Sequence, residues 1–328
     1  MQRIAVIGAG AWGTALAAVA RRAGRDVVIH AHEAETAAAI NDSHENRIFL
    51  PGIALDPAIT ATDDISHAAD EADAIVMVTP AQFLRTTLTA LAPAPDTPLI
   101  ICSKGIELDT GKLMNEVAEE TAPDTELAVL SGPTFAAEVA RGLPTAVTLA
   151  CTNAGTAAGL AAALGTPSFR PYTATDLVGA EVGGAIKNVI AIACGIVEGR
   201  ALGQNARAAV IARGLAEITR FAAALGADPR TLMGLSGLGD LTLTCTSTAS
   251  RNYSLGKSLG SGSSYADAIA GKSSVAEGAT TAPAVLTRAA ALGVEMPICA
   301  AVSAILHDDA DVDETITAIL ARPLRAEG

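Results

Sequence analysis

The sequence predicts a doubly wound α/β domain with a parallel sheet, followed by an all-helical domain. Short apolar runs rich in β-branched residues alternate with helix-like stretches through the first half of the chain. This alternation is typical of a parallel sheet covered by helices on both faces. After about residue 176 the apolar spacing is helical and no comparable strand follows. We therefore expect two domains, at residues 1–176 and 177–328.

The strands of the first domain are expected where short apolar runs end in polar or turn-forming residues. Five runs are clear, and two weaker runs could extend the sheet. The clear strands lie at 3–7, 27–30, 74–79, 99–103 and 127–131, and the extensions at 146–150 and 169–172. Between them the sequence predicts helices at 14–23, 81–91, 111–121 and 134–141.

The second half is expected to hold six helices, and Pro283 and Pro297 fall near helix starts, where proline is tolerated. The run at 178–197 is long enough to cross a membrane. Lys187 and Asn188 at its centre would make such a span costly, so we expect a buried core helix. The expected helices lie at 176–199, 205–226, 263–270, 279–292, 298–307 and 312–321.

The composition excludes several classes of protein. The formal net charge of −13 argues against a nucleic-acid or anionic-lipid partner, since both require a basic surface. The five cysteines are scattered without a CxxC pair, which favours reduced thiols and a cytoplasmic location. No pair of histidines has the spacing of metal ligands, and the N-terminus lacks a signal-peptide pattern, so we expect neither a metal site nor export.

A glycine-rich loop follows the first expected strand. Gly8-x-Gly10-x-x-Gly13 has the dinucleotide-binding spacing, with one glycine for the turn, one for the pyrophosphate and one for helix packing. The pyrophosphate would then meet the free N–H groups at the start of the helix. Glu33 after the second strand would suit NAD, but His32 precedes it, so the choice between NAD and NADP stays open.

One lysine lies in an otherwise apolar run, 179–190. A buried lysine is unfavourable unless it is paired or used, so Lys187 is either a core lysine or the acid/base of a redox enzyme. Burial and a nearby cation would lower its pKa toward neutrality. We expect Gly183 and Gly184, one turn earlier, to leave room for a substrate or cofactor.

Four further segments carry polar groups beside expected turns, and each also has an ordinary structural explanation. Lys104 follows a strand, where it would hold an anion or remain solvated. Thr134 and Asp240 each suit a helix cap as well as a ligand contact. The fourth segment is Ser250-Arg251-Asn252, an arginine flanked by a hydroxyl and an amide. It could bind a phosphate group or form an ordinary surface loop.

Taken together, these segments resemble the bacterial type of NAD(P)-dependent glycerol-3-phosphate dehydrogenase. The matching motifs occur in family order over nearly the whole chain. They are GAGAWGTALA (8–17), NRIFLPG (46–52), SKGIE (103–107), SGPTFAAEVARG (131–142), GAEVGGAIKNVIAIACGI (179–196), NARAAVIARGLAEITR (205–220), GLSGLGDLTLTCTSTASRN (234–252) and VAEG (275–278).

The resemblance implies a Rossmann domain joined to a helical domain like that of 6-phosphogluconate dehydrogenase. It implies an enzyme that interconverts sn-glycerol 3-phosphate and dihydroxyacetone phosphate and supplies glycerol phosphate for phospholipid synthesis. Lys187 takes the position of the catalytic proton acceptor. The substrate positions fall on Lys104, Gly132, Thr134, Lys187, Asp240, Ser250, Arg251 and Asn252. The NAD(P) positions fall on Gly8, Gly10, Ala11, Trp12, Gly13, His32, Phe49, Lys104, Ala136, Arg251, Val275 and Glu277.

Two positions depart from the commoner family pattern, and two other functions remain as alternatives. Ala11 lacks a hydroxyl often found there, and His32 stands where a basic pair is usual. One alternative is another two-domain dehydrogenase, acting on a hydroxyacyl thioester or a hydroxy acid. The other is a dinucleotide-sensing protein without catalysis. The oligomeric state is left open, with a homodimer as one option.

Overall fold

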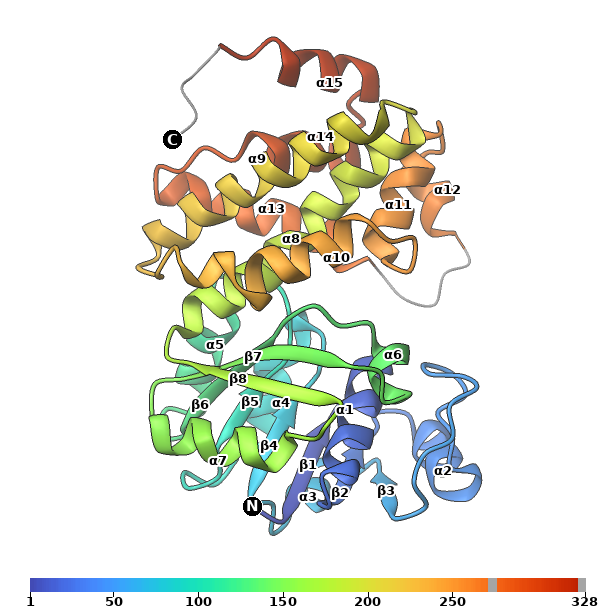
Figure 1. Cartoon of the computed structure of the whole chain (residues 1–328), viewed down its shortest axis with the longest axis vertical. Coiled ribbons are helices and arrows are strands. Elements are labelled where there is room, and N and C mark those ends of the chain that lie inside the picture. The colour runs from blue at the N-terminus through green and yellow to red at the C-terminus, as the bar shows by residue number, and fades with distance from the viewer. Residues whose placement is uncertain (271–275, 324–328) are drawn as a thin grey trace.

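The computed structural model describes residues 1–270 and 276–323 and has two parts (Figure 1). The N-terminal part is an eight-stranded sheet flanked by helices, and the part that follows is helical. The predicted fold class is therefore confirmed. The two weaker runs do extend the sheet, as β7 (Thr145–Cys151) and β8 (Phe169–Ala174).

The strand order of the sheet is β3-β2-β1-β4-β5-β6-β7-β8. The order reverses direction at β1, which is where ligands bind in open α/β sheets. The remaining strands are β1 (Arg3–Ile7), β2 (Asp26–His30), β3 (Ile59–Thr62), β4 (Ala74–Met77), β5 (Leu99–Ile101) and β6 (Leu127–Ser131).

The sheet is mixed, so the expectation of a parallel sheet was wrong for β7 and β8, which run opposite to the other six strands. β7 runs antiparallel to β6, with Ser131 opposite Thr148. The only helix between them, α6 (Ala136–Ala140), has five residues and is about 7.5 Å long, too short for a return along the sheet. The chain therefore stays at the carboxyl edge and enters β7 from there.

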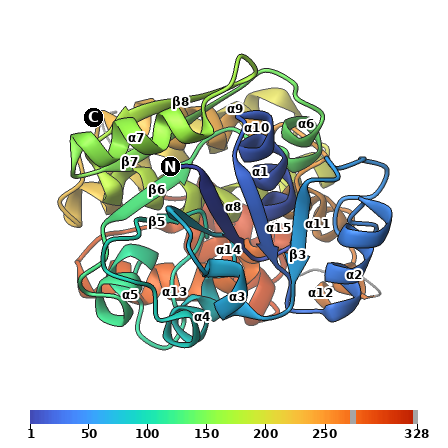
Figure 2. The same cartoon turned by 90° about the horizontal axis from the view of Figure 1, so that it is seen from below.

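The strands alternate their side chains between two cores. In β1, Ile4 and Val6 join the core on one face, whereas Ala5 and Ile7 join the core on the other. The first face is covered by α1 (Ala11–Arg22), α6 and α7 (Ala154–Leu164), and the second by α3 (Ile65–Ala69), α4 (Leu84–Leu91) and α5 (Met114–Thr121), on opposite sides of the strands in Figure 2.

Several elements were not predicted, and none of them has more than eleven residues. β3 has four residues, and only two of them are buried. Helix α7 is built from alanine and glycine with little amphipathic contrast. Also missed were α2 (Ala34–Ser43), α3, α10 (Asp240–Cys245) and α11 (Arg251–Gly260).

The helical part is built around α8 (Leu177–Gly199), which lies at its centre (Figure 1). Helix α8 has the length and composition of a membrane span, but its apolar stretch is completely buried among the other helices. It is therefore the core helix that the sequence predicts. Around it lie α9 (Gly203–Ala224), α10, α11, α12 (Tyr265–Ile269), α13 (Glu277–Ala291), α14 (Pro297–His307) and α15 (Val312–Leu320).

Helices α8 and α11 cross at glycines on both sides. A Cβ at Gly195 would lie 2.1 Å from the carbonyl oxygen of Tyr253, and one at Gly256 would lie 2.0 Å from that of Ile192. No side chain fits at such distances, so the two backbones are in direct contact. This contact fixes the position of α8 along its axis.

Pro283 lies inside α13 and not near its start, as the sequence had suggested. A proline cannot donate to the carbonyl four residues earlier, which belongs to Ala279. That carbonyl is instead 2.9 Å from Nε2 of His307 on α14. The side chain of a neighbouring helix thus replaces the missing hydrogen bond, and the helix continues through the proline.

We expect Gly256→Ala to lower the free energy of unfolding by more than about 2 kcal/mol, because overpacking against a backbone carbonyl forces the helices apart. Gly159→Ala in α7 is the matched control, since its new methyl group would make an ordinary contact at 3.6 Å. That change should stabilise the chain by about 0.5–1 kcal/mol. Denaturant unfolding measures both, and equal effects would contradict the close crossing.

Candidate active site

Four candidate segments meet at the carboxyl edge of the sheet. Gly8 follows β1, Lys104 lies three residues beyond β5, and Gly132 follows β6. Helix α8 packs against β6 and brings Lys187 to the same edge. This is the edge where ligands bind in open α/β sheets.

The glycine loop has the geometry that its spacing predicts. Gly8 has φ +116°, a conformation that side chains disfavour. A Cβ at Gly13 would lie 1.9 Å from the carbonyl oxygen of Gly8, whereas one at Gly10 would have no described residue within 4 Å apart from its chain neighbours. The loop is therefore closed by Gly13 and open at Gly10, where a pyrophosphate could approach the backbone.

The first turn of α1 leaves its backbone donors free. Gly10 is the N-cap and lacks a side chain, and within the described residues the N–H groups of Ala11, Trp12 and Gly13 have no acceptor. Three free donors at the positive end of a twelve-residue helix form an anion site. The loop and helix therefore fit a dinucleotide pyrophosphate.

A single carboxylate joins the two predicted lysines. Oδ1 of Asp240 is 2.5 Å from Nζ of Lys187, and its Oδ2 is 2.7 Å from Nζ of Lys104. Asp240 is fully buried and Lys187 is 6% exposed. Asp240 opens α10 after a π-helical turn at 235–239, and its side chain pairs with the lysines and does not cap the helix.

Burial lowers the pKa of Lys187 to about 8; the charge of Asp240 opposes this shift and that of Lys104 adds to it. A lysine with such a pKa can hold or release a proton near neutral pH. Lys187 lies within the core helix, whereas the Lys104 side chain is partly exposed.

Thr244 is a member of this cluster that the sequence reasoning missed. Its Oγ1 is 3.0 Å from Nζ of Lys187 and 3.4 Å from Oδ1 of Asp240. Thr244 follows Asp240 by four residues, so the two lie on the same face of α10. That spacing was visible in the sequence once Asp240 was placed on a helix.

Gly183 and Gly184 do not leave room for a ligand, so that expectation was wrong. A Cβ at Gly183 would lie 2.3 Å from the carbonyl oxygen of Ser236, and one at Gly184 would lie 3.0 Å from Oγ of Ser131. Protein atoms occupy both places. The glycines instead allow α8 to lie directly against the turn before Asp240 and against the end of β6.

The three residues 250–252 form the N-terminus of α11. Ser250 is the N-cap, and its Oγ accepts from the N–H of Tyr253. Oδ1 of Asn252 accepts from the N–H of Gly278, which leaves its amide Nδ2 free to donate. The Arg251 side chain is exposed and has no partner within the described residues. The N-terminus of α11 and the guanidinium group of Arg251 could together bind an anion.

The remaining predicted positions surround this cluster. Burial raises the pKa of Glu277, and the charges of Arg251, Lys104 and Lys187 oppose that shift, which places Glu277 beside them. Oγ1 of Thr134 is 3.3 Å from the carbonyl oxygen of Gly132, and Phe135, not Thr134, is the N-cap of α6. Ala136 opens α6, Phe49 is half-buried and His32 is exposed after β2, while Val275 lies outside the described residues.

Both parts of the chain match models of one protein family. Residues 3–157 match the N-terminal domain of NAD-dependent glycerol-3-phosphate dehydrogenase, and residues 176–317 match its C-terminal domain. The chain belongs to this family. It is 58% identical to the glycerol-3-phosphate dehydrogenase (NAD(P)+) of Caulobacter vibrioides over 99% of each chain.

Two further relatives agree in sequence and in structure. The glycerol-3-phosphate dehydrogenase (NAD(P)+) of Rhodospirillum rubrum is 57% identical over the whole of this chain and 95% of that protein. The crystal structure of the glycerol-3-phosphate dehydrogenase of Coxiella burnetii superposes with a TM-score of 0.94 at 36% identity, covering 98% of this chain and 99% of that one. The chain is thus an NAD(P)-dependent dehydrogenase that interconverts glycerol 3-phosphate and dihydroxyacetone phosphate.

In this dehydrogenase α8 is anchored to the N-terminal part by a buried carboxylate. Oε1 of Glu181 is 3.0 Å from the N–H of Asn115 in the first turn of α5. Glu181 is 2% exposed, and burial raises its pKa to about 8, opposed by the backbone donors of α5. The anchor lies six residues before Lys187 and holds α8 against the N-terminal part.

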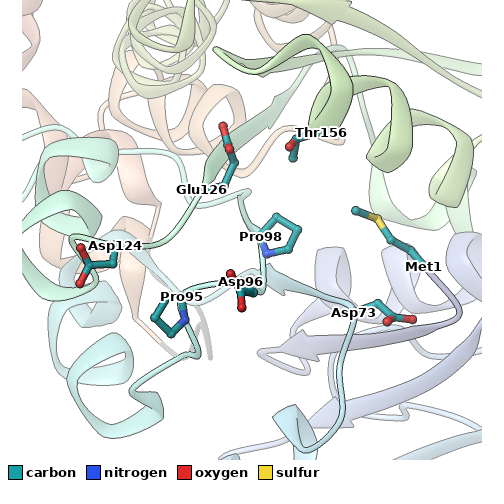
Figure 3. Close-up of a pocket in the computed structure, with 8 residues that line it drawn as sticks. All are labelled: Met1, Asp73, Pro95, Asp96, Pro98, Asp124, Glu126 and Thr156. Carbon is teal, nitrogen blue, oxygen red and sulfur yellow. The ribbon is translucent and has the colours of Figure 1, made fainter.

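A pocket on another side of the dehydrogenase lies away from these residues. It is lined by side chains that precede strands, including Asp73 before β4, Pro98 before β5 and Glu126 before β6 (Figure 3). These positions lie at the amino edge of the sheet, opposite the glycine loop. None of the predicted site residues that the structure describes lines this pocket.

The raised pKa of Glu181 predicts a pH-dependent stability. An unfolded glutamate has a pKa near 4.3, so between about pH 4.3 and 8 the folded chain binds a proton that the unfolded chain releases. Stability should therefore fall with rising pH in this window, by up to about 1.4 kcal/mol per pH unit from this group. Glu181→Gln, which stays neutral, should unfold at a higher temperature than the wild type at pH 8, and this difference should be much smaller at pH 5.

Thermal unfolding at several pH values measures this difference, with the exposed Glu314→Gln as a control that should follow the wild type. A constant difference between Glu181→Gln and the wild type from pH 5 to 8 would contradict the assignment.

Proposed function

We propose that Lys187 is the general acid/base of glycerol 3-phosphate oxidation and dihydroxyacetone phosphate reduction. The observation that carries this proposal is the buried Lys187, with a pKa near 8, bonded to Asp240 beside Lys104. In the oxidation, neutral Lys187 takes the proton of the C2 hydroxyl group. In the reduction, the ammonium returns this proton to the C2 oxygen.

Bound NAD(P) supplies the hydride acceptor in one direction and the hydride donor in the other. The residues of this chain hold the Lys187 Nζ that accepts and returns the proton. Asp240 holds the Lys187 side chain through Oδ1, and Thr244 gives its Nζ a second partner at 3.0 Å. Lys104 balances the charge of Asp240 when Lys187 is neutral, so the cluster can lose a proton without leaving a buried carboxylate unpaired.

The substrate phosphate is assigned to the start of α11. Arg251 would form charge-assisted hydrogen bonds, with Ser250 and the free amide of Asn252 beside it. Gly132 and Thr134, at the end of β6, complete the proposed substrate site together with Lys104. Binding of the phosphate away from C2 helps to fix the reacting carbon.

The cofactor is assigned to the glycine loop and to the residues around it. The pyrophosphate would lie against the free N–H groups of Ala11, Trp12 and Gly13, with the loop open at Gly10. The other proposed cofactor positions are Gly8, His32, Phe49, Lys104, Ala136, Arg251, Val275 and Glu277.

The cellular role and the domain boundary are also proposals. We assign residues 1–176 to the dinucleotide-binding domain and 177–328 to the substrate domain, supported by the start of α8 at Leu177. Five free cysteines support a cytoplasmic location. The product of the reduction suits a role in supplying glycerol 3-phosphate for phospholipid synthesis.

Lys187→Ala should lower turnover by about 10²–10⁴-fold, as expected for loss of a general acid/base. The affinity for NADH should be nearly unchanged, which fluorescence titration measures.

In the wild type, kcat/KM for oxidation should fall tenfold per pH unit below about pH 8, because protonated Lys187 cannot accept a proton. This pH dependence should be absent in Lys187→Ala. Lys257→Ala, a surface lysine, serves as control, and near-normal turnover of Lys187→Ala would exclude the role.

Arg251→Ala should raise the KM for dihydroxyacetone phosphate by about 10–100-fold, since a hydrogen bond to a charged group contributes about 1.5–3 kcal/mol. Steady-state kinetics at saturating NADH separate this effect from any change in cofactor affinity. Arg230→Ala removes another exposed guanidinium, one that pairs with Asp228, and is the control. An unchanged KM would remove Arg251 from the phosphate site.

A further inference from the structure

The residues of the glycine loop do not by themselves fix the orientation of its peptide planes. The peptide that joins Ala9 to Gly10 turns by rotation about ψ of Ala9 and φ of Gly10, and Gly10 allows the backbone many conformations. If this peptide plane turned over, a carbonyl oxygen would replace an N–H group on the side open to the pyrophosphate. Such an oxygen would repel the anion, so the loop requires a group that holds its carbonyls on the other side.

Asn46 meets this requirement from a distant part of the chain. It is 1% exposed, and its Nδ2 donates to the carbonyl oxygen of Ala9 at 2.7 Å and to Oγ1 of Thr14 at 2.8 Å. Because the C=O and N–H groups of a trans peptide point in opposite directions, the bond to Ala9 directs the N–H of Gly10 to the open side.

Thr14 extends the same constraint to the next peptide. Its Oγ1 donates to the carbonyl oxygen of Gly10 at 2.9 Å, and the N–H of Thr14 reaches the same oxygen at 3.0 Å. The N–H of Ala11 must therefore point away from Thr14. Thr14 is fully buried, so water does not compete for these bonds.

The third bond of Asn46 reaches another proposed cofactor residue. Its Oδ1 accepts from the N–H of Phe49 at 3.1 Å. Nδ2 of Asn46 thus makes two hydrogen bonds as a donor and Oδ1 accepts one. The Asn46 side chain therefore links the glycine loop to the 46–49 segment. Asn41, in the same domain, serves as a comparison, since within the described residues its amide bonds only to the backbone of Ala61 on β3.

We propose that Asn46, together with Thr14, is a positioning residue that keeps the N–H groups of the glycine loop directed at the pyrophosphate of NAD(H) or NADP(H). The proposal rests on the proposed cofactor site. It assigns to Asn46 no contact with the cofactor itself. Its effect should therefore appear in the affinity for pyrophosphate-containing ligands and not in the chemical step.

The fluorescence of Trp12 allows NADH binding to be measured without an activity assay. It is the sole tryptophan of the chain and lies in the first turn of α1. Bound NADH should therefore quench its fluorescence. If NADH binds the wild type without changing this fluorescence, the cofactor site itself is wrong and the proposal is overturned with it.

The variants are Asn46→Ala, Thr14→Val and Thr14→Ser. Asn46→Ala removes two buried donations and should weaken NADH about 10–100-fold. Thr14→Val removes the hydroxyl at nearly constant volume and should weaken NADH about tenfold, whereas Thr14→Ser keeps the hydroxyl and should bind NADH within about twofold of the wild type. At saturating NADH, kcat and the KM for dihydroxyacetone phosphate should remain within about twofold for all three.

Competition with two fragments separates positioning from a general loss of structure. ADP carries the pyrophosphate and should be weakened as much as NADH in Asn46→Ala, whereas adenosine, which lacks it, should bind as in the wild type. Asn41→Ala is the matched control and should lose thermal stability with unchanged NADH affinity. Equal weakening of ADP and adenosine, or wild-type affinity of both Asn46→Ala and Thr14→Val, would overturn the proposal.

Discussion

The site depends on one buried carboxylate that is shared by two cations. Asp240 comes from the helical part, and its two oxygens pair with Lys187 of the same part and with Lys104 of the N-terminal part. A buried ion that loses its partner is strongly unfavourable. The pairing therefore ties the relative position of the two parts to the charge state of the reacting groups, and a shift of either part would leave a charge uncompensated.

Helix α8 transmits this constraint along its length. Its first turns are anchored to α5 by Glu181, its middle carries Lys187, and its last turns are in backbone contact with α11 at Gly195. Close-packed interiors deform little, so a helix held at both ends places its central side chain reproducibly. Gly183 and Gly184 also help to hold α8 in place, because the lack of side chains lets Ser236 and Ser131 pack directly against the helix.

Much of this arrangement was predictable from sequence, for identifiable reasons. The glycine loop, the alternation of strands and helices, and the unusual Lys187 are local patterns, and the structure places Lys187 and Asp240 in direct contact. The direction of β7 was not predictable, since it depends on how far α6 carries the chain. Thr244 and Asn46 were missed because their roles come from contacts with residues distant in the sequence, at Lys187 and Ala9.

The reversed direction of β7 has a topological consequence for catalysis. In an all-parallel sheet, the segment after β6 would leave the carboxyl edge and cross one face of the sheet to reach the amino edge. Here residues 132–144 begin and end at that edge, between two strands that are hydrogen-bonded to each other from Ser131 to Thr148. Gly132 and Thr134, which are assigned to the substrate, and Ala136, which is assigned to the cofactor, therefore lie on one loop whose two ends are held by the same pair of strands.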